Sequence, residues 1–304
     1  LVPGSVWSLF EIMSRAGLPA GVGNLVMGPG RVVGEVITTS DKVSAVSFTG
    51  SVGTGHHIRE VVTGRGAKVQ LEMGGKNPLV VLDDADLDVA VNCAVQGAFY
   101  STGQRCTASS RLIVTEGIHD EFVARLTAEV EALTVGHALH EGTQIGPVVN
   151  ETQLQQDLDY VDIAVKEGGT LACGGIRLDL DDKGFYMAPA LIANTTPDMR
   201  INREEVFGPV ASVIKVRNYE EALQVANDTE FGLSAGICTT SLKYSSHFKR
   251  RSEASMVMIN LPTAGVDYHV PFGGRKGSSY GSREQGSYAR EFYTIVKTAY
   301  ILPL

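Results

Sequence analysis

Apolar positions recur along this chain at two spacings, and segments of the two kinds alternate. Apolar residues at every third or fourth position predict helices, at Trp7–Arg15, His56–Thr63, Leu87–Tyr100, His119–Leu133, Gln153–Glu167, Glu220–Asn227 and Leu242–Ser252. Short β-branched runs predict strands, at Asn24–Met27, Val43–Phe48, Lys68–Leu71, Val80–Leu82, Leu112–Thr115, Leu171–Cys173, Ala235–Thr239, Phe292–Ile301 and the end of Asn202–Val213. Strands alternating with helices indicate an α/β fold with a mostly parallel sheet and crossover connections.

One cysteine, Cys106, lies in a small and polar loop between the predicted helix Leu87–Tyr100 and the predicted strand Leu112–Thr115. A thiol at such a junction can meet a substrate while its neighbours fix its position, and a deprotonated cysteine is a strong nucleophile. The alternative is a buried and unreactive thiol, which is what most free cysteines are. The loop alone leaves both interpretations open.

Glycine-rich turns follow two of the predicted strands. Gly28 and Gly30 come after Asn24–Met27, and Gly50–Gly55 leads from the next strand into a helix. Free backbone N–H groups at a helix start form a site for phosphate, although each turn can also be a plain strand-to-helix connection. Glu72 follows a third strand, at the kind of carboxyl end where ligands of parallel sheets collect.

Composition narrows the function. With 304 residues the chain is long enough for about two domains, and its formal net charge of −8 argues against a general affinity for nucleic acid. No stretch approaches the roughly 20 apolar residues of a membrane span, and the first residues do not resemble a signal peptide. The four cysteines form no Cys-x-x-Cys pair, which argues against structural zinc or a disulfide framework and favours a reducing, cytoplasmic setting.

Five motifs together resemble the aldehyde dehydrogenase superfamily, in that family's order and across the whole chain. They are Phe48-Thr-Gly-Ser51, Leu71-Glu-Met-Gly-Gly-Lys-Asn-Pro78, Gly103-Gln-Arg-Cys106, Glu205-Val-Phe-Gly-Pro-Val210 and Pro271-Phe-Gly-Gly274. The segment Val266–Tyr300 looks most like the α-ketoglutaric semialdehyde dehydrogenase branch.

The resemblance implies an incomplete Rossmann-type parallel sheet domain, an α/β catalytic domain and a C-terminal oligomerisation strand. Residues 1–73 would be the C-terminal part of the NAD(P)-binding domain, residues 74–272 the catalytic domain, and residues 273–304 a return to the cofactor domain that ends in the strand. A strand at the end of a chain is a candidate for pairing with another subunit, so a homo-oligomer, dimer or tetramer, is expected.

The resemblance also implies a mechanism. Cys106 would attack an aldehyde, such as the semialdehyde 2,5-dioxopentanoate, to give a thiohemiacetal, and hydride transfer to NAD or NADP would leave a thioester. Glu72 would activate the water that hydrolyses it. The residues that the resemblance assigns to the cofactor are Gly28, Gly50, Ser51, Gly55, Met73, Glu205 and Phe207, with Glu205 on the nicotinamide ribose and Phe207 beside the ring. No metal ion is implied.

Substrate contacts are assigned to Arg105 and Thr107, which flank the nucleophile. Arg105, together with Arg275 and Lys276, would favour an aldehyde that carries a carboxylate. The alternative for these three basic residues is structural ion pairing or solvent exposure.

The resemblance implies that a large N-terminal part of the family precedes Leu1, including an asparagine that supplies a second oxyanion donor and a lysine that grips the adenosine ribose. We therefore expect little turnover from this chain alone, because losing one oxyanion donor costs on the order of a hundredfold to a thousandfold in rate. A non-catalytic relative that acts in assembly or binding is one alternative, and a cysteine hydrolase that needs no cofactor is another.

Overall fold

The computed structural model describes residues 2–304, and these form two compact units. The smaller unit comprises the residues up to Ser47 together with His56–Val69, and the larger one comprises Phe48–Gly55 together with Gln70–Leu304. Each unit is described here by itself. The predicted domain boundaries, at residues 73/74 and 272/273, differ from the boundaries of these two units. Because the units are not the same as domains, the domain boundaries stay a prediction.

A seven-stranded sheet forms the centre of the larger unit, in the order β12-β11-β3-β4-β9-β8-β5. All neighbouring strands in it are parallel except β5 and β8, which are antiparallel. The strands are β3 (Asn77–Val81), β4 (Ser109–Thr115), β5 (Thr170–Cys173), β8 (Ala190–Thr195), β9 (Val210–Val216), β11 (Ser234–Cys238) and β12 (Met256–Ile259). The predicted α/β fold with a mostly parallel sheet is therefore confirmed.

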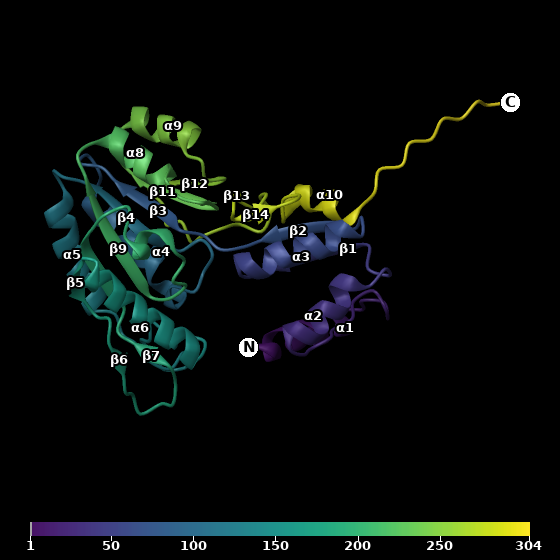
Figure 1. The fold of residues 1–304 in the computed structure, drawn as a ribbon, viewed down its shortest axis with the longest axis horizontal. Coiled ribbons are helices and arrows are strands. Elements are labelled where there is room, and N and C mark those ends of the chain that lie inside the picture. The colour runs from purple at the N-terminus through teal and green to yellow at the C-terminus, as the bar shows by residue number, and fades with distance from the viewer. Residues whose placement is uncertain (1) are drawn as a thin grey trace. The chain divides into compact units, whose positions relative to one another are not determined.

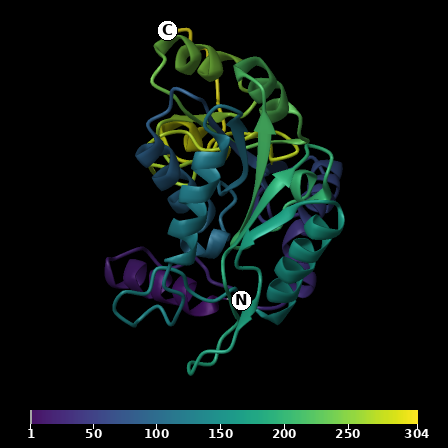
Figure 2. The same cartoon turned by 90° about the vertical axis from the view of Figure 1, so that its left-hand side faces the viewer.

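Helices cover both faces of this sheet, as Figures 1 and 2 show. Successive residues of a strand point to opposite faces, so in β3 Leu79 packs in one hydrophobic cluster and Val80 in another. The cluster of Leu79 includes side chains of α4 (Leu87–Ala98) and α5 (His119–Glu131). The cluster of Val80 includes those of α8 (Tyr219–Asn227) and α9 (Leu242–Arg251). A third cluster joins α6 (Glu151–Lys166) to β8.

Shorter elements complete the larger unit. They are the 3-10 helix η1 (Tyr100–Gly103), β6 (Arg177–Leu178), β7 (Tyr186–Met187), α7 (Arg200–Arg203), β10 (Phe231–Gly232), β13 (Arg275–Lys276), β14 (Ser279–Tyr280), η2 (Gly286–Tyr288) and α10 (Ala289–Tyr293). A second sheet has the order β1-β2-β14. The predicted strands Val43–Phe48 and Lys68–Leu71 correspond to β1 (Ala45–Thr49) and β2 (Lys68–Glu72).

The smaller unit contains α1 (Pro3–Arg15), α2 (Gly30–Thr39) and most of α3 (Val52–Gly64). Helix α1 begins earlier than predicted because Pro3 occupies its first turn, where the missing N–H costs nothing. Helix α3 also begins earlier than predicted and takes in Gly53 and Gly55. No helix in the described part of the chain is long and apolar enough to cross a membrane.

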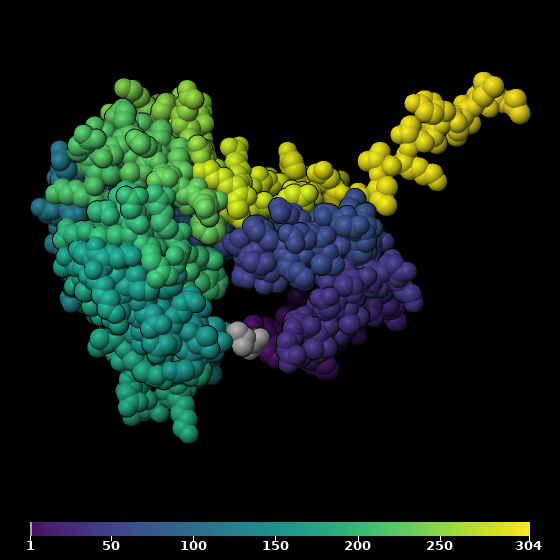
Figure 3. Space-filling view, viewed as in Figure 1, coloured from purple at the N-terminus to yellow at the C-terminus, as the bar shows by residue number. Residues whose placement is uncertain are grey.

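Two predicted strands are wrong. Asn24–Met27 forms no strand, and the side chains of Val26 and Met27 are exposed. Phe292–Ile301 is not a strand either: Phe292 lies in α10, and residues 294–304 have no secondary structure and are exposed (the yellow segment in Figure 3). A β-branched run becomes a strand only when another strand pairs with its backbone, and neither segment has such a neighbour within residues 2–304.

Candidate active site

The loop that carries Cys106 has an unusual backbone. Three consecutive residues of η1 adopt positive φ angles: Ser101 at 56°, Thr102 at 59° and Gly103 at 63°. A Cβ atom on Gly103 would lie 2.0 Å from the carbonyl oxygen of Gly208, so only glycine fits at this position. The chain thereby turns sharply from α4 into β4 and leaves Cys106 half-buried.

Asn77, at the start of β3, holds the Cys106 loop by hydrogen bonds from its side chain. Its side-chain amide donates to the carbonyl oxygens of Cys106 at 2.8 Å and Ala108 at 2.9 Å. Its carbonyl oxygen accepts from the backbone N–H of Ser234 at 3.0 Å. One buried side chain therefore joins the loop to two strands. The sequence motif contained this asparagine, but nothing in the pattern showed that it would contact the cysteine loop.

Burial governs the protonation of Cys106. Burial, together with the nearby carboxylates of Glu205 and Glu72, raises the pKa of its thiol to about 11. The thiol is therefore protonated at neutral pH in the structure described here, and its activation needs a base or a change in its surroundings. The other three cysteines are free and buried, and Cys173 lies at the end of β5, within the strand predicted at Leu171–Cys173.

Glu72 is the last residue of β2 and is buried, with 3% of its surface exposed. It lies opposite Ser279 of β14, whose hydroxyl donates to the Glu72 carboxylate at 2.5 Å and accepts from the backbone N–H of Gly274 at 2.6 Å. Burial raises the pKa of Glu72 to about 7, and the hydrogen bond from Ser279 opposes this shift. A carboxyl group with this pKa can exchange protons near neutral pH.

Two glycines bring the third functional side chain close. The backbone N–H of Gly75 donates to Glu205 at 2.9 Å, and a Cβ atom on Gly74 would lie 2.2 Å from the Glu205 carboxylate. A Cβ atom on Gly75 would lie 2.6 Å from the carbonyl oxygen of Cys106. The turn after Glu72 therefore touches both the Glu205 carboxylate and the Cys106 loop, and larger residues would separate them.

Lys76, which the sequence did not single out for this site, adds a buried amine beside Glu205. Its Nζ atom has no hydrogen-bond partner among the described residues. Burial and the neighbouring Arg111 together lower the pKa of Lys76 to about 7, and Glu205 opposes the shift. In return Lys76 lowers the pKa of Glu205, which burial raises. The two buried groups favour each other's charged forms.

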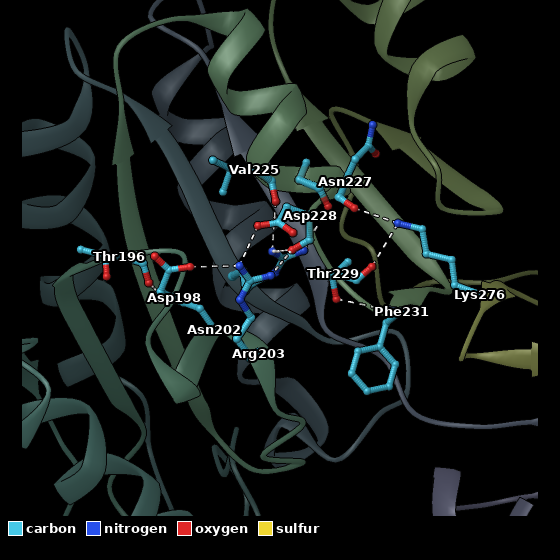
Figure 4. A network of polar contacts seen from close by, with 12 residues as sticks. Thr196, Asp198, Asn202, Arg203, Val225, Asn227, Asp228, Thr229, Phe231 and Lys276 are labelled. Carbon is cyan, nitrogen blue, oxygen red and sulfur yellow. Dashed lines mark hydrogen bonds and ion pairs between the residues drawn. The ribbon is translucent and has the colours of Figure 1, made fainter. Parts of the chain in front are cut away.

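Arg203 anchors the segment that leads into Glu205, at the end of α7 (Figure 4). Its guanidinium donates to the side chain of Asp228 at 2.7 Å and to that of Asp198 at 3.2 Å. In the same network the amine of Lys276 donates to the backbone carbonyls of Asn227 and Thr229 (Figure 4). Lys276 also forms an ion pair with Glu253. These contacts favour a structural role for Lys276 over recognition of a substrate carboxylate.

The two residues assigned to the substrate flank Cys106. Arg105 is half-buried; it donates to the hydroxyl of Ser101 at 2.5 Å and to the carbonyl of Ala264 at 3.4 Å. Thr107 is buried, and its carbonyl accepts from the hydroxyl of Thr263 at 2.7 Å. Both lie beside the nucleophile.

The residues assigned to the cofactor fall into two groups. Gly50, Gly55 and Met73 lie together in the larger unit: a Cβ atom on Gly55 would lie 2.3 Å from the Met73 sulfur, and the N–H of Gly50 donates to the carbonyl of Glu72 at 3.1 Å. Ser51 is exposed directly before α3. Gly28 belongs to the smaller unit, where it lies shortly before α2.

Comparisons with known proteins agree with the motifs. A family model described as "Aldehyde dehydrogenase family" matches residues 1–299. The α-ketoglutaric semialdehyde dehydrogenase of Bacillus subtilis is 47% identical over 297 residues, covering 97% of this chain and 61% of the relative. The 2,5-dioxopentanoate dehydrogenase of Saccharolobus solfataricus is 41% identical over 98% of this chain and 62% of the relative. The chain thus spans about three fifths of the length of these relatives.

Solved structures give the same result for the fold. A betaine aldehyde dehydrogenase from Staphylococcus aureus, in complex with NAD+, has a TM-score of 0.92 at 36% identity, covering 96% of this chain and 58% of that one. An NAD-dependent aldehyde dehydrogenase from Sinorhizobium meliloti has a TM-score of 0.92 at 38% identity, covering 95% and 57%. The chain folds as the corresponding part of these proteins.

Proposed function

We propose, because this chain belongs to the aldehyde dehydrogenase family, that it carries the nucleophile and the general base of an enzyme that oxidises an aldehyde to a carboxylate with NAD or NADP. The observation that supports this best is the turn Gly74–Gly75, which follows Glu72 and touches both Glu205 and the Cys106 loop. A base, a nucleophile and a ribose anchor are thereby gathered around four consecutive residues.

In the proposed reaction the Cys106 sulfur attacks the aldehyde carbon and the thiol proton passes to the aldehyde oxygen, which accepts a hydrogen bond from the backbone N–H of Cys106, so that a thiohemiacetal forms. When the thiohemiacetal loses its hydride, its hydroxyl proton passes to water. The bound nicotinamide supplies the acceptor for the hydride, and a thioester remains. Glu72 takes a proton from water, whose oxygen attacks the thioester carbon, and the Cys106 thiol leaves with the carboxylate as product. The raised pKa of Glu72 suits this proton transfer at neutral pH.

The residues of the larger unit fit a dinucleotide. Gly50 and Ser51 directly precede α3, where free backbone N–H groups and the helix dipole favour phosphate. A Cβ atom on Gly50 would lie 2.4 Å from the Phe48 ring, so that this turn stays narrow only with glycine. The Phe207 ring is 38% exposed, and Glu205 is held close by. We assign the ribose to Glu205, the ring contact to Phe207, and further cofactor contacts to Gly55 and Met73.

For the substrate we propose a semialdehyde such as 2,5-dioxopentanoate, because relatives with 47% and 41% identity carry α-ketoglutaric semialdehyde and 2,5-dioxopentanoate in their names. Arg105, half-buried beside the nucleophile, is the residue that we assign to the distal carboxylate. Thr107, the other neighbour of Cys106, is also assigned to the substrate. We also propose a reducing, cytoplasmic setting, since all four cysteines are free, and a homo-oligomer.

The test combines absorbance near 340 nm, which follows NADH or NADPH formation, with mass spectrometry of Cys106. We expect 2,5-dioxopentanoate and NAD(P)⁺ to give reduced cofactor and a transient acyl adduct on Cys106, and Cys106→Ser to abolish both. Adduct formation is the more sensitive readout if turnover by this chain is slow. A Cys106→Ser variant that retains the full rate would remove the nucleophile from the mechanism. The non-catalytic alternative is not favoured, because the chain belongs to the aldehyde dehydrogenase family and the similar relatives are named as dehydrogenases.

A further inference from the structure

An acidic side chain, Asp157, is completely buried beneath the loop that follows Glu205. It lies on the inner face of α6 with none of its surface exposed. One carboxylate oxygen accepts from the side-chain amide of Gln153 at 2.8 Å. The other, Oδ2, is buried and has no hydrogen-bond partner within the described part of the chain. A buried carboxyl is costly unless it makes a needed contact, so its surroundings call for an explanation.

The Asp157 carboxyl is in contact with the backbone of Gly208. A Cβ atom on Gly208 would lie 2.2 Å from the Asp157 Cγ and Oδ2 atoms, which leaves room for no side chain. On the other side of Gly208, its carbonyl oxygen would lie 2.0 Å from a Cβ atom on Gly103. A continuous series of close contacts therefore runs from Asp157 through Gly208 to Gly103. Gly103 precedes Cys106 by three residues in the sequence.

The same helix holds the residue on the other side of Phe207. The amides of Gln153 and Gln156 both donate to the carbonyl of Val206, at 2.8 and 2.9 Å. Phe207 itself has a φ of 62°, a conformation that a bulky residue adopts only when its neighbours are fixed. Helix α6 thus fixes Val206 through two amides and Gly208 through one carboxyl.

We propose that Asp157 is a positioning residue of the active site, which holds Gly208 and through it sets both the exposed Phe207 ring and the loop of Cys106. The inference rests on the proposed function only for the roles of Cys106 and Phe207. The contact itself depends on the shape and polarity of the side chain and not on a negative charge.

A neutral form of Asp157 is consistent with this role. Burial raises the pKa of Asp157 to about 7, and the hydrogen bond from Gln153 opposes the shift. The carboxylic acid has a hydroxyl that can donate to a nearby acceptor, whereas the carboxylate only accepts. Asparagine has nearly the same shape and is also neutral with a donor and an acceptor, so Asp157→Asn preserves what the proposal requires.

The test measures how fast iodoacetamide alkylates Cys106 in the full chain, by mass spectrometry of the Cys106 peptide. The variants are Asp157→Leu, which removes the polar contact, and Asp157→Asn, which keeps it. Asp159→Leu is the matched control, because Asp159 is exposed on the same helix. The buried cysteines Cys93, Cys173 and Cys238 report on unfolding in the same digest.

We expect Asp157→Leu to speed Cys106 alkylation about fivefold, the effect of loosening the loop by about 1 kcal/mol. Asp157→Asn and Asp159→Leu should stay within about twofold of the unchanged protein. If Asp157→Leu exposes the buried cysteines, Asp157→Ala replaces it with the same expectation, because it removes the contact without added bulk.

Two results would overturn the proposal: an unchanged Cys106 rate in the leucine or alanine variant, or an asparagine variant as fast as the leucine one. The first would show that this series of contacts does not set the loop, and the second that polarity and shape do not matter. Neither result depends on dehydrogenase activity, so the proposal and the proposed function can fail separately.

Discussion

Cys106 and Glu72 both hold their protons more firmly than the free side chains do, and burial is the main cause in each case. For Cys106, the proposed nucleophile, this means a resting thiol, and for Glu72, the proposed base, it means a carboxyl that titrates near neutrality. The two groups are linked, because the Glu72 carboxylate is one of the groups that raise the pKa of Cys106. Protonating Glu72 therefore removes one of the causes that keep Cys106 protonated.

The pH dependence of Cys106 alkylation follows from its pKa. With a pKa of about 11, the thiolate fraction increases with pH throughout the range below that value. The alkylation rate should rise about tenfold per pH unit and show no plateau near pH 8.5, where a free cysteine levels off. The measurement is peptide-resolved alkylation, with free cysteine as the reference. If the alkylation rate instead levelled off near pH 8.5, as for free cysteine, burial would not raise the pKa of Cys106.

Glu72 should make folding less favourable as the pH rises. Its pKa is about 7 in the folded protein and ordinarily 4.5, so the folded state binds more protons between these values. The stabilisation of the neutral form is complete below 4.5 and is lost by about pH 7. Glu72→Gln stays neutral, so it should raise the free energy of unfolding by about 1–3 kcal/mol at roughly pH 8 and change it little below pH 4.5.

Denaturant unfolding at two pH values measures this difference. The matched control is Glu60→Gln, because Glu60 is exposed on α3. A Glu72→Gln variant no more stable than the unchanged protein at the higher pH would show that the carboxylate is well solvated in the folded state.

Among the elements, β3 connects the sheet to the site through a single side chain. Asn77 donates to two carbonyls of the cysteine loop and accepts from a backbone N–H of β11. Asn77→Leu would leave three buried backbone groups without this partner, at a cost of about 1–3 kcal/mol for each unsatisfied group. We expect a total loss of about 2–4 kcal/mol, since the loop can relax, and faster alkylation of Cys106.

The control for this variant is Asn92→Leu on the exposed side of α4, where the asparagine only accepts from Gln96. Its effect should stay within about 0.5 kcal/mol. Equal effects of the two substitutions would mean that the contacts of Asn77 with the cysteine loop do not stabilise the fold.

The periodicity predicted most elements because burial on both faces leaves a clear pattern. In β3 all five residues are buried, and in α5 the buried residues Phe122, Leu126 and Val130 recur at intervals of four. Asn24–Met27 and Phe292–Ile301 have the same composition without a pairing strand, so the pattern alone misled. Strand β8 was missed although most of its residues are buried, because the run Ala190–Thr195 has few β-branched residues and contains two alanines and an asparagine.

Within the site, the motifs indicated the groups that we propose to react but not the groups that hold them. Lys76, Asn77 and Asp157 act through contacts between segments far apart in the sequence, such as the 29 positions from Asn77 to Cys106. Local spacing carries no information about such pairs. A buried aspartate on an amphipathic helix was the one available signal, because Asp157 occupies a position of the apolar face of α6.

For the molecule as a whole, the distribution of apolar surface differs between the units. The larger unit buries its apolar side chains in three clusters. In α1, all of which the structure describes, no residue is buried, and Trp7 and Ile12 are 58% and 55% exposed. Several exposed apolar side chains on one helix favour binding of another surface.

Charged substitutions on α1 should therefore leave the fold unchanged and reduce self-association. Because Trp7 and Ile12 are exposed, Trp7→Glu and Ile12→Glu should each alter the free energy of unfolding by less than about 0.5 kcal/mol. Both should lower the binding of a hydrophobic dye and the mass measured by light scattering at high concentration. Val62→Glu is the contrasting variant: Val62 is fully buried in α3, and an unpaired charge there should cost several kcal/mol. If Trp7→Glu destabilised the chain as strongly as Val62→Glu, α1 would be packed against another part of the chain in solution.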